Sequence, residues 1–193
     1  MRLGLRVDVD TLIGLKEGVP RLLELFKGYS IPVSFFVTFG PDNSGKALSR
    51  LLQPGFLLKM WRTNPFRLYG VRTILSGTLL RPSLVGEGSP EILRSIVSEG
   101  HELGIHGYDH VRWQDHVDKM GEGEIEHQLR KAIEAYENIF TLSPVGTAAP
   151  GWKSTPLSLA VQDRLKFSYA SDTRGTSPFL PVHKGYCFHT LQL

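Results

Sequence analysis

Short runs of consecutive apolar residues alternate along the chain with segments in which apolar positions recur every three or four residues. The continuous runs predict buried strands at residues 3–9, 31–39, 102–105, 144–149 and 167–170, with a further possible strand at 185–193. The helical periodicity predicts helices at residues 18–27, 89–100, 122–140 and 157–165. Short strands that alternate with helices are typical of an α/β fold with parallel strands.

Residue types at the helix ends support these assignments. Ser89 and Pro90 fit the N-cap and the first helical position of the second helix. Gly28 fits the C-terminal end of the first helix, because glycine accepts the left-handed conformation that often follows a helix. The chain therefore begins with a strand, a helix and a second strand, which predicts a parallel βαβ unit.

The composition is that of an ordinary globular protein, and 193 residues fit a single domain spanning residues 1–193. Cys187 is the only cysteine, which excludes an intrachain disulfide and favours a reducing compartment. The first residues lack the pattern of a signal peptide, and no apolar run is long enough to span a bilayer. A cytoplasmic location is expected.

The segment 43–86, here called the basic segment, differs from the rest of the chain because it contains no acidic residue. Its basic residues are Lys46, Arg50, Lys59, Arg62, Arg67, Arg72 and Arg81. Large apolar residues, among them Phe56 and Trp61, interleave with these cations. One interpretation is an elaborated crossover that covers one end of the domain. The other is an insertion that contacts an anionic membrane surface or a phospholipid-like substrate, with Phe56 and Trp61 among the headgroups and Arg62, Arg67 and Arg72 on phosphates.

Nucleic acid is not expected as the partner of the basic segment, because leucine-rich patches do not suit a wet phosphate interface. The expected location is therefore peripheral, on the inner face of the cytoplasmic membrane.

Polar side chains gather directly after the predicted strands. In parallel α/β folds the chemistry collects at the carboxyl ends of the strands, so we expect these side chains to meet. One carboxylate and two imidazoles are a suitable ligand set for a divalent metal ion. The residues at these positions are Asp8 and Asp10, His106 and His110, Trp152, and Asp172 with Arg174.

Three of these motifs resemble the polysaccharide deacetylase (NodB-homology) superfamily: Val7-Asp8-Val9-Asp10, Ser34-Phe35-Phe36-Val37 and the His106-x-x-x-His110 pair. Others are more similar to one branch of it, the 4-deoxy-4-formamido-L-arabinose-phosphoundecaprenol deformylases of lipid A modification. Those are Gly40-Pro41-Asp42-Asn43, Ala148-Ala149-Pro150-Gly151-Trp152 and Ser171-Asp172-Thr173-Arg174-Gly175. The resemblance implies a distorted (β/α) barrel with the basic segment inserted after the second strand.

The resemblance also implies roles for individual residues. Asp10, His106 and His110 would hold one divalent ion, with zinc, cobalt, manganese and nickel as candidates. Asp8 would be the catalytic base. Trp152 would lie where a backbone N–H helps to form an oxyanion hole, and Asp172 and Arg174 would orient the base. The implied reaction is hydrolysis of the formamide on undecaprenyl-phosphate-linked 4-deoxy-4-formamido-L-arabinose, in lipid A modification and cationic peptide resistance.

The chain departs from the superfamily pattern at two points. The third motif usually opens with an arginine, which is missing here, and Arg174 or Lys153 is the expected substitute. A late strand that carries a general-acid histidine has no clear counterpart, and neither His183 nor His189 is assigned that role. The barrel is therefore expected to be incomplete, as in a C-terminally truncated member. Two alternatives stay open: a deacetylase of another amino sugar, and an inactive truncated domain that binds anionic lipid.

Overall fold

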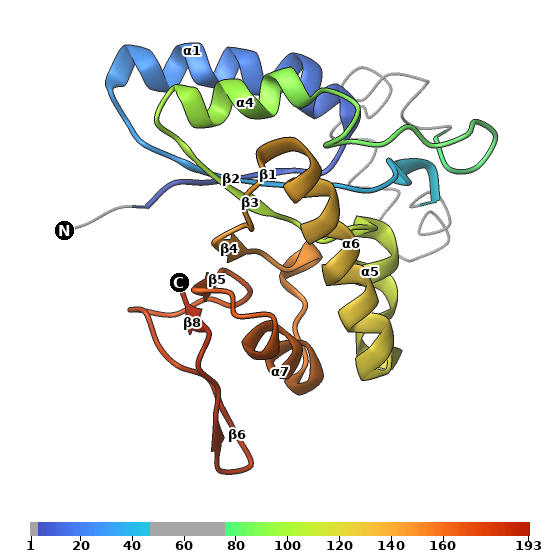
Figure 1. Cartoon of the computed structure of the whole chain (residues 1–193), viewed down its shortest axis with the longest axis vertical. Coiled ribbons are helices and arrows are strands. Elements are labelled where there is room, and N and C mark those ends of the chain that lie inside the picture. The colour runs from blue at the N-terminus through green and yellow to red at the C-terminus, as the bar shows by residue number, and fades with distance from the viewer. Residues whose placement is uncertain (1–3, 47–75) are drawn as a thin grey trace, which may run out of the picture.

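A parallel sheet of six strands forms the centre of the protein, in the order β1-β2-β3-β4-β5-β8 (Figure 1). The computed structural model describes residues 4–46 and 76–193. The sheet curls into part of a barrel, which confirms the expected distorted, incomplete α/β barrel. The strands are β1 (Arg6–Val9), β2 (Ser34–Val37), β3 (Glu102–Ile105), β4 (Gly146–Thr147), β5 (Tyr169–Ala170) and β8 (Leu191–Gln192).

The two sides of the sheet carry different residues, because successive side chains of a strand point to opposite sides. On one side, Val9, Phe35 and Ile105 are buried in the hydrophobic core. Helices α4 and α6 pack against β3, and α1 lies beside α4 (Figure 1). Arg6 and Asp8 alternate with the core residues of β1, so the polar chemistry arises from the opposite side of the sheet. The helices are α1 (Val19–Tyr29), α4 (Pro90–Ser98) and α6 (Glu122–Phe140).

The predicted helices are present, with one difference in the first. Helix α1 follows a π-helical turn, η1 (Gly14–Gly18), and continues through Gly28 to Tyr29. It ends at Ser30, which takes the left-handed conformation with a φ of 53°. The fourth predicted helix is α7 (Pro156–Arg164), closed at its start by a capping box between Thr155 and Ser158.

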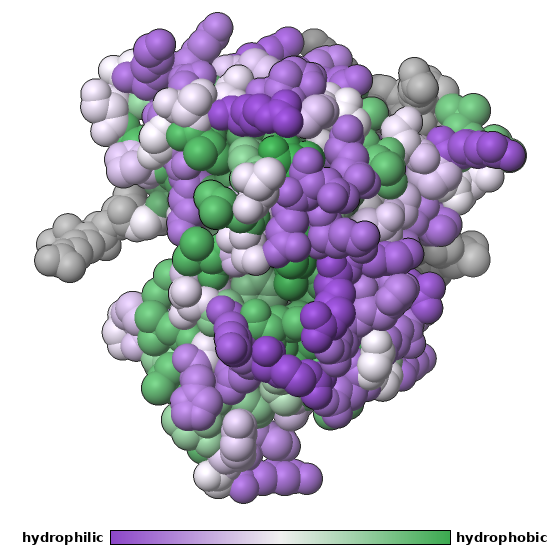
Figure 2. Space-filling view, in the orientation of Figure 1, coloured by the Kyte–Doolittle hydropathy of each residue, from purple (hydrophilic) through white to green (hydrophobic). Residues whose placement is uncertain are grey.

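Helix α5 (His110–His116) and strand β6 (Val182–His183) were not predicted, whereas the strand expected at 185–193 is present as two short strands, β7 (Tyr186–Cys187) and β8. Helix α5 begins at the second histidine, where the sequence suggested only a turn and a loop. It has seven residues with only Trp113 buried, too few for a helical period to show. Strands β6 and β7 form an exposed hairpin that lacks a burial pattern. Hydrophobic residues gather on the surface around this hairpin and β8 (Figure 2).

The two ends of the basic segment meet beside the carboxyl end of β2. Gly45 N–H donates to the Ser76 carbonyl at 2.8 Å, and Asn43 Nδ2 donates to Asp109 Oδ2 at 2.7 Å. The residues predicted to contact lipid lie outside the described residues; they are Phe56, Trp61, Arg62, Arg67 and Arg72. In the described part of the chain, no helix has both the length and the apolar character needed to cross a membrane.

Candidate metal centre

Asp10, His106 and His110 come together at the carboxyl ends of β1 and β3. One ligand atom from each lies within 4.8 Å of the others. Asp10 Oδ1 is 3.4 Å from His106 Nε2 and 3.5 Å from His110 Nε2. This is the trio that the sequence predicted, and both imidazoles present the same nitrogen to the shared carboxylate.

A tight turn between β3 and α5 brings the two histidines to one place. His106 directly follows β3, and Gly107 takes a φ of +69°, a conformation that glycine adopts without strain. Asp109 then caps α5, because its Oδ1 accepts the Arg112 N–H at 3.0 Å. His110 is therefore the first residue of α5 and lies one tight turn away from His106.

The tautomer of His106 is determined by its surroundings. Its Nδ1 lies 2.8 Å from the Ala148 carbonyl oxygen, which can only accept, so Nδ1 carries the proton and Nε2 is free to bind a cation. Burial lowers the pKa of His106 to about 4, although the Asp10 and Asp8 carboxylates act in the opposite direction. The imidazole is thus neutral near pH 7, as a metal ligand must be.

These observations show that the residues fit a divalent metal ion. Two imidazoles and one carboxylate match the donor types of catalytic zinc sites, and three protein ligands leave a position open for water or substrate. Other first-row divalent ions accept the same donors, so the ligand set alone does not choose among them.

Asp8 is held by Arg6, a residue that the sequence interpretation overlooked. Arg6 Nε donates to Asp8 Oδ1 at 2.6 Å and its second terminal nitrogen donates to Oδ2 at 2.8 Å, a two-point pairing. The other terminal nitrogen donates to the Ser171 carbonyl and hydroxyl oxygens. Asp8 Oδ2 is 3.9 Å from His106 Nε2, beside the ligands. The alternation of residues along β1 could have revealed the pair, because Arg6 and Asp8 share one side of the strand.

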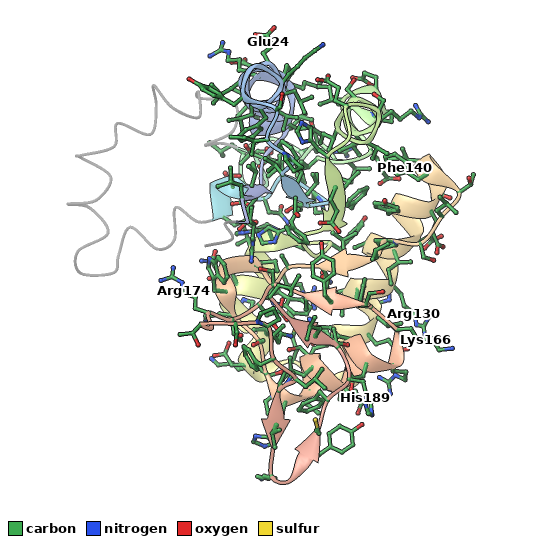
Figure 3. All side chains as sticks on the ribbon, turned by 90° about the vertical axis from the view of Figure 1, so that its left-hand side faces the viewer. Glu24, Arg130, Phe140, Lys166, Arg174 and His189 are labelled. Atoms are coloured by element: carbon green, nitrogen blue, oxygen red, sulfur yellow. The ribbon has the colours of Figure 1, made fainter. Side chains whose placement is uncertain are left out.

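The expected substitutes for the third-motif arginine have other contacts. Lys153 lies 3.6 Å from Asp118, and Arg174 lies with its guanidinium carbon 5.4 Å from the centre of the Trp152 ring. Figure 3 shows Arg174 pointing outward from the body of the protein. The two oxygens of the Asp8 carboxylate are occupied by Arg6 instead, so the substitution by Lys153 or Arg174 stays a prediction.

Trp152 reaches the site through its ring. The Arg6 guanidinium carbon lies 4.0 Å from the centre of the indole ring, which covers it. The Trp152 backbone N–H, expected near an oxyanion hole, donates to the Ala149 carbonyl at 3.1 Å within the turn η4 (Pro150–Trp152). Trp152 takes a φ of 57°, which is uncommon outside glycine, and its side chain stays partly exposed.

Asp172 is fully buried and does not reach Asp8, so it does not orient the base directly. Its Oδ1 accepts the Ala149 N–H at 2.7 Å and its Oδ2 accepts Gln162 Nε2 at 2.7 Å. Burial raises the pKa of Asp172 to about 6, although the bonds from Gln162 and Ala149 and the charge of Arg6 act to lower it.

The two C-terminal histidines lie away from the metal centre. His183 belongs to the exposed β6–β7 hairpin. The His189 N–H donates to Asp163, and Figure 3 shows this residue on another side of the molecule from Arg174. Within the described part of the chain, no contact joins either histidine to the three ligands.

Known proteins similar to this chain include members of one hydrolase family. Residues 7–170 match the polysaccharide deacetylase family. The chain is 40% identical over 93% of its length to a "Probable 4-deoxy-4-formamido-L-arabinose-phosphoundecaprenol deformylase ArnD" of Shewanella sediminis, and covers 59% of that protein. It is 35% identical over 88% of its length to a protein of the same name from Wigglesworthia glossinidia brevipalpis, again covering 59%. The chain thus spans about three fifths of the length of these relatives.

Solved structures show the same fold. A Mycobacterium smegmatis protein described as a polysaccharide deacetylase superposes with a TM-score of 0.64 at 23% identity, covering 98% of this chain and 57% of that one. A family 4 carbohydrate esterase from Streptomyces lividans gives a TM-score of 0.55 at 12% identity, covering 88% and 60%. Because the match over residues 7–170 covers most of its length, the chain belongs to the polysaccharide deacetylase family.

Proposed function

We propose that the protein hydrolyses the formamide of 4-deoxy-4-formamido-L-arabinose linked to undecaprenyl phosphate, with one divalent metal ion bound by Asp10, His106 and His110. The observation that carries the proposal is the convergence of these three ligand atoms, with His106 already in the tautomer that a metal requires. The two relatives named as deformylases of this lipid-linked sugar support the choice of substrate.

The bound ion would polarise the formamide carbonyl and acidify a water molecule. Asp8 is placed to remove the proton of that water, because it lies beside His106 but is not one of the three ligands. Arg6 holds both oxygens of Asp8 and so fixes the direction in which the carboxylate faces the ligands. Trp152 covers the Arg6 guanidinium and limits the access of water to the ion pair.

The basic segment is proposed to bring the protein to the anionic membrane surface that carries the substrate. Its first residue, Asn43, is bonded to Asp109, the neighbour of the ligand His110. A surface bound by this segment would therefore lie near the metal centre. The described part includes Leu79, Leu80 and Arg81 in an exposed loop that projects from the body of the protein (Figure 1).

Metal analysis of the purified protein tests the centre. We expect one divalent ion per chain, and loss of that ion in the double variant His106→Ala/His110→Ala. His116→Ala is the matched control, because this exposed histidine lies at the far end of the same short helix. Unchanged metal content in the double variant would contradict the proposed centre.

Release of formate from the lipid-linked sugar tests the reaction. We expect metal-dependent formate release by the wild-type chain and none by Asp8→Asn, which keeps the shape of the side chain but removes its basicity. Release of acetate from an N-acetylated amino sugar, with no formate from the formamide, would favour the alternative deacetylase.

A second candidate function, lipid binding without hydrolysis, is favoured by the 80% exposure of Leu79 beside exposed Leu80 and Arg81. Flotation with phosphatidylglycerol vesicles tests it. We expect binding that weakens in Leu79→Ser/Leu80→Ser, whereas Leu142→Ser, an exposed leucine elsewhere, has no effect. Vesicle binding combined with no formate release, in a protein that retains its metal, would support this candidate over the hydrolase.

A further inference from the structure

A continuous chain of hydrogen bonds connects the buried Asp172 to the metal ligand His106. Asp172 Oδ1 accepts the Ala149 N–H at 2.7 Å, and the Ala148 carbonyl accepts the His106 Nδ1–H at 2.8 Å. That N–H and that carbonyl belong to the same peptide unit, the one between Ala148 and Ala149. The carboxylate and the imidazole therefore bind the two ends of one amide dipole.

The peptide unit is fixed in place by the sheet. Ala148 directly follows β4, and its N–H donates to the Ile105 carbonyl at 2.9 Å. His106 follows Ile105 on the neighbouring strand β3. The peptide carbonyl and the imidazole that donates to it are therefore held by the same pair of strands. His106, Ala148, Ala149 and Asp172 are each at most 2% exposed. Water therefore does not compete for these bonds, and each bond polarises the next.

We propose that Asp172 is a positioning residue for the metal ligand His106 and acts through the Ala148–Ala149 peptide. A negative charge at the N–H end of the peptide strengthens its carbonyl as an acceptor. The stronger acceptor holds the Nδ1 proton of His106 and increases the electron density at Nε2, the nitrogen that faces Asp10. This inference rests on the proposed metal centre, and it adds a residue whose carboxylate bonds to Ala149 and Gln162 and to none of the three ligands.

The surroundings of Asp172 argue that its charge, and not only its shape, is used. A buried carboxylate is costly, and the groups that donate to this one are both amides, the Ala149 N–H and Gln162 Nε2. Within the described residues, the charge facing it is Arg6, which contacts Asp8 and Ser171 instead. An asparagine would fit the same space. Gln162 Oε1 has no partner, so once the Gln162 side-chain amide turns over, this oxygen could accept a hydrogen bond from the asparagine amide.

The first experiment needs no metal. In metal-free protein with ¹⁵N-labelled histidine, the chemical shift of the His106 Nδ1 proton reports the strength of its bond to Ala148. We expect this proton to move upfield in Asp172→Asn, because the peptide carbonyl becomes a weaker acceptor. Asp163→Asn is the matched control: this neighbouring carboxylate also accepts backbone N–H groups, those of His189 and Thr190, and has no link to His106.

The second experiment measures the affinity for Zn²⁺ by competition with a chelator. We expect the Kd to rise about tenfold in Asp172→Asn, the size of effect that partners behind a metal ligand usually have. Asp163→Asn should leave the Kd unchanged. If the wild-type protein binds no Zn²⁺, the proposed metal centre fails. The proton shift still decides whether Asp172 acts on His106 through the Ala148–Ala149 peptide, a connection here called the Asp172 relay.

The relay would be overturned by an Asp172→Asn variant that folds and shows both an unchanged proton shift and an unchanged Kd. If that variant does not fold, Gln162→Leu replaces it at pH 8. Removing the amide donor leaves the Ala149 N–H as the main partner of the ionised carboxylate, so the His106 proton should then move downfield. An upfield or absent shift in Gln162→Leu would contradict the proposal.

Discussion

Two carboxylates near the metal centre, Asp8 on β1 and Asp172 after β5, are stabilised in different ways. On β1, the Asp8 side chain is 27% exposed and pairs with Arg6 at two points. After β5, Asp172 is fully buried and accepts amide N–H groups only. An accessible carboxylate with a cation beside it can meet water and substrate. A buried one without a cation can act only through the groups that it touches.

The exposure of each carboxylate to solvent therefore goes with the kind of partner it has: a cation for Asp8 and amides for Asp172. The arginine is used where the carboxylate is exposed and must keep a fixed orientation. In the interior, bringing an arginine beside Asp172 would bury a second charge, which often costs more than the pairing returns. The peptide at the end of β4 takes that place instead and passes the effect of the carboxylate to His106.

The largest effect is expected on the β1 side, from Arg6→Ala. Without its two-point partner, Asp8 is no longer oriented, and kcat for formate release should fall about 100-fold, within the range that a positioned base contributes. The metal content should stay unchanged, because Arg6 contacts none of the three ligands in the described structure. The measurements are steady-state kinetics and metal analysis of the same preparation.

Two further variants sharpen this test. Arg6→Lys keeps the charge but cannot hold both carboxylate oxygens, so we expect an intermediate loss. Arg130→Ala is the control: this exposed arginine pairs with Glu126, and Figure 3 shows it away from Arg174. Equal rates for Arg6→Ala and the wild type would mean that Asp8 needs no partner, and the contrast with Asp172 would lose its basis.

A smaller effect is expected on the β5 side, in the stability of the metal-free protein. The folded-state pKa of Asp172 is raised from 3.8 to about 6, so the folded protein binds this proton more tightly than the unfolded chain does. The contribution of Asp172 to stability is therefore greatest below about pH 4 and is lost as the pH rises to about 6. At pH 7 the ionised carboxylate costs on the order of 2 kcal/mol. Asp172→Asn should raise the free energy of unfolding at pH 7 by a similar amount.

Urea denaturation of both proteins at several pH values gives the measurement. The difference between wild type and Asp172→Asn should be largest at pH 7 and should shrink towards pH 4, where the wild-type carboxyl group is also neutral. Because both proteins contain the same other acidic residues, the contributions of those residues to the pH dependence cancel in the difference. A variant that is less stable than the wild type at pH 7 would show that Asp172 serves the fold, whereas a more stable variant with weaker Zn²⁺ binding would show that its charge serves the site.

Much of the metal centre could be predicted from the sequence because its residues follow directly after strands. Asp10 and His106 each follow an apolar run, and the parallel order of the strands brings such positions to one edge of the sheet. The six strands and the four longer helices follow from the same alternation of patterns. Helix α6 has the predicted bounds because its apolar stripe repeats over nineteen residues.

The supporting contacts could be predicted only in part. The alternation along β1 puts Arg6 and Asp8 on one side of the strand, whereas the bonds of Arg6 to Ser171 and of Asp172 to Ala149 depend on pairings that leave no local pattern. Arg6 reads as a polar residue inside an apolar strand, and its partner is defined only once the strand alternation and the position of Ser171 are known. Asp172 reads as one of several polar loop residues. Its bond to a backbone N–H twenty-three positions earlier depends on the packing of β5 beside β4.

The smallest effect on kcat is expected from changes at Trp152, which lies between Arg6 and the solvent. Its ring lies against Arg6, and an arginine stacked on an indole gains about 1 kcal/mol when it is partly desolvated. Trp152→Leu should therefore lower kcat about fivefold, because Arg6 holds Asp8 less firmly, while Trp152→Phe, which keeps an aromatic face, should lose less. Neither change should alter the Zn²⁺ affinity, since the Asp172 relay does not include this ring. Equal losses in both variants would mean that Trp152 acts by filling space, and a loss of Zn²⁺ affinity in either would show that the two sides of the site are not independent.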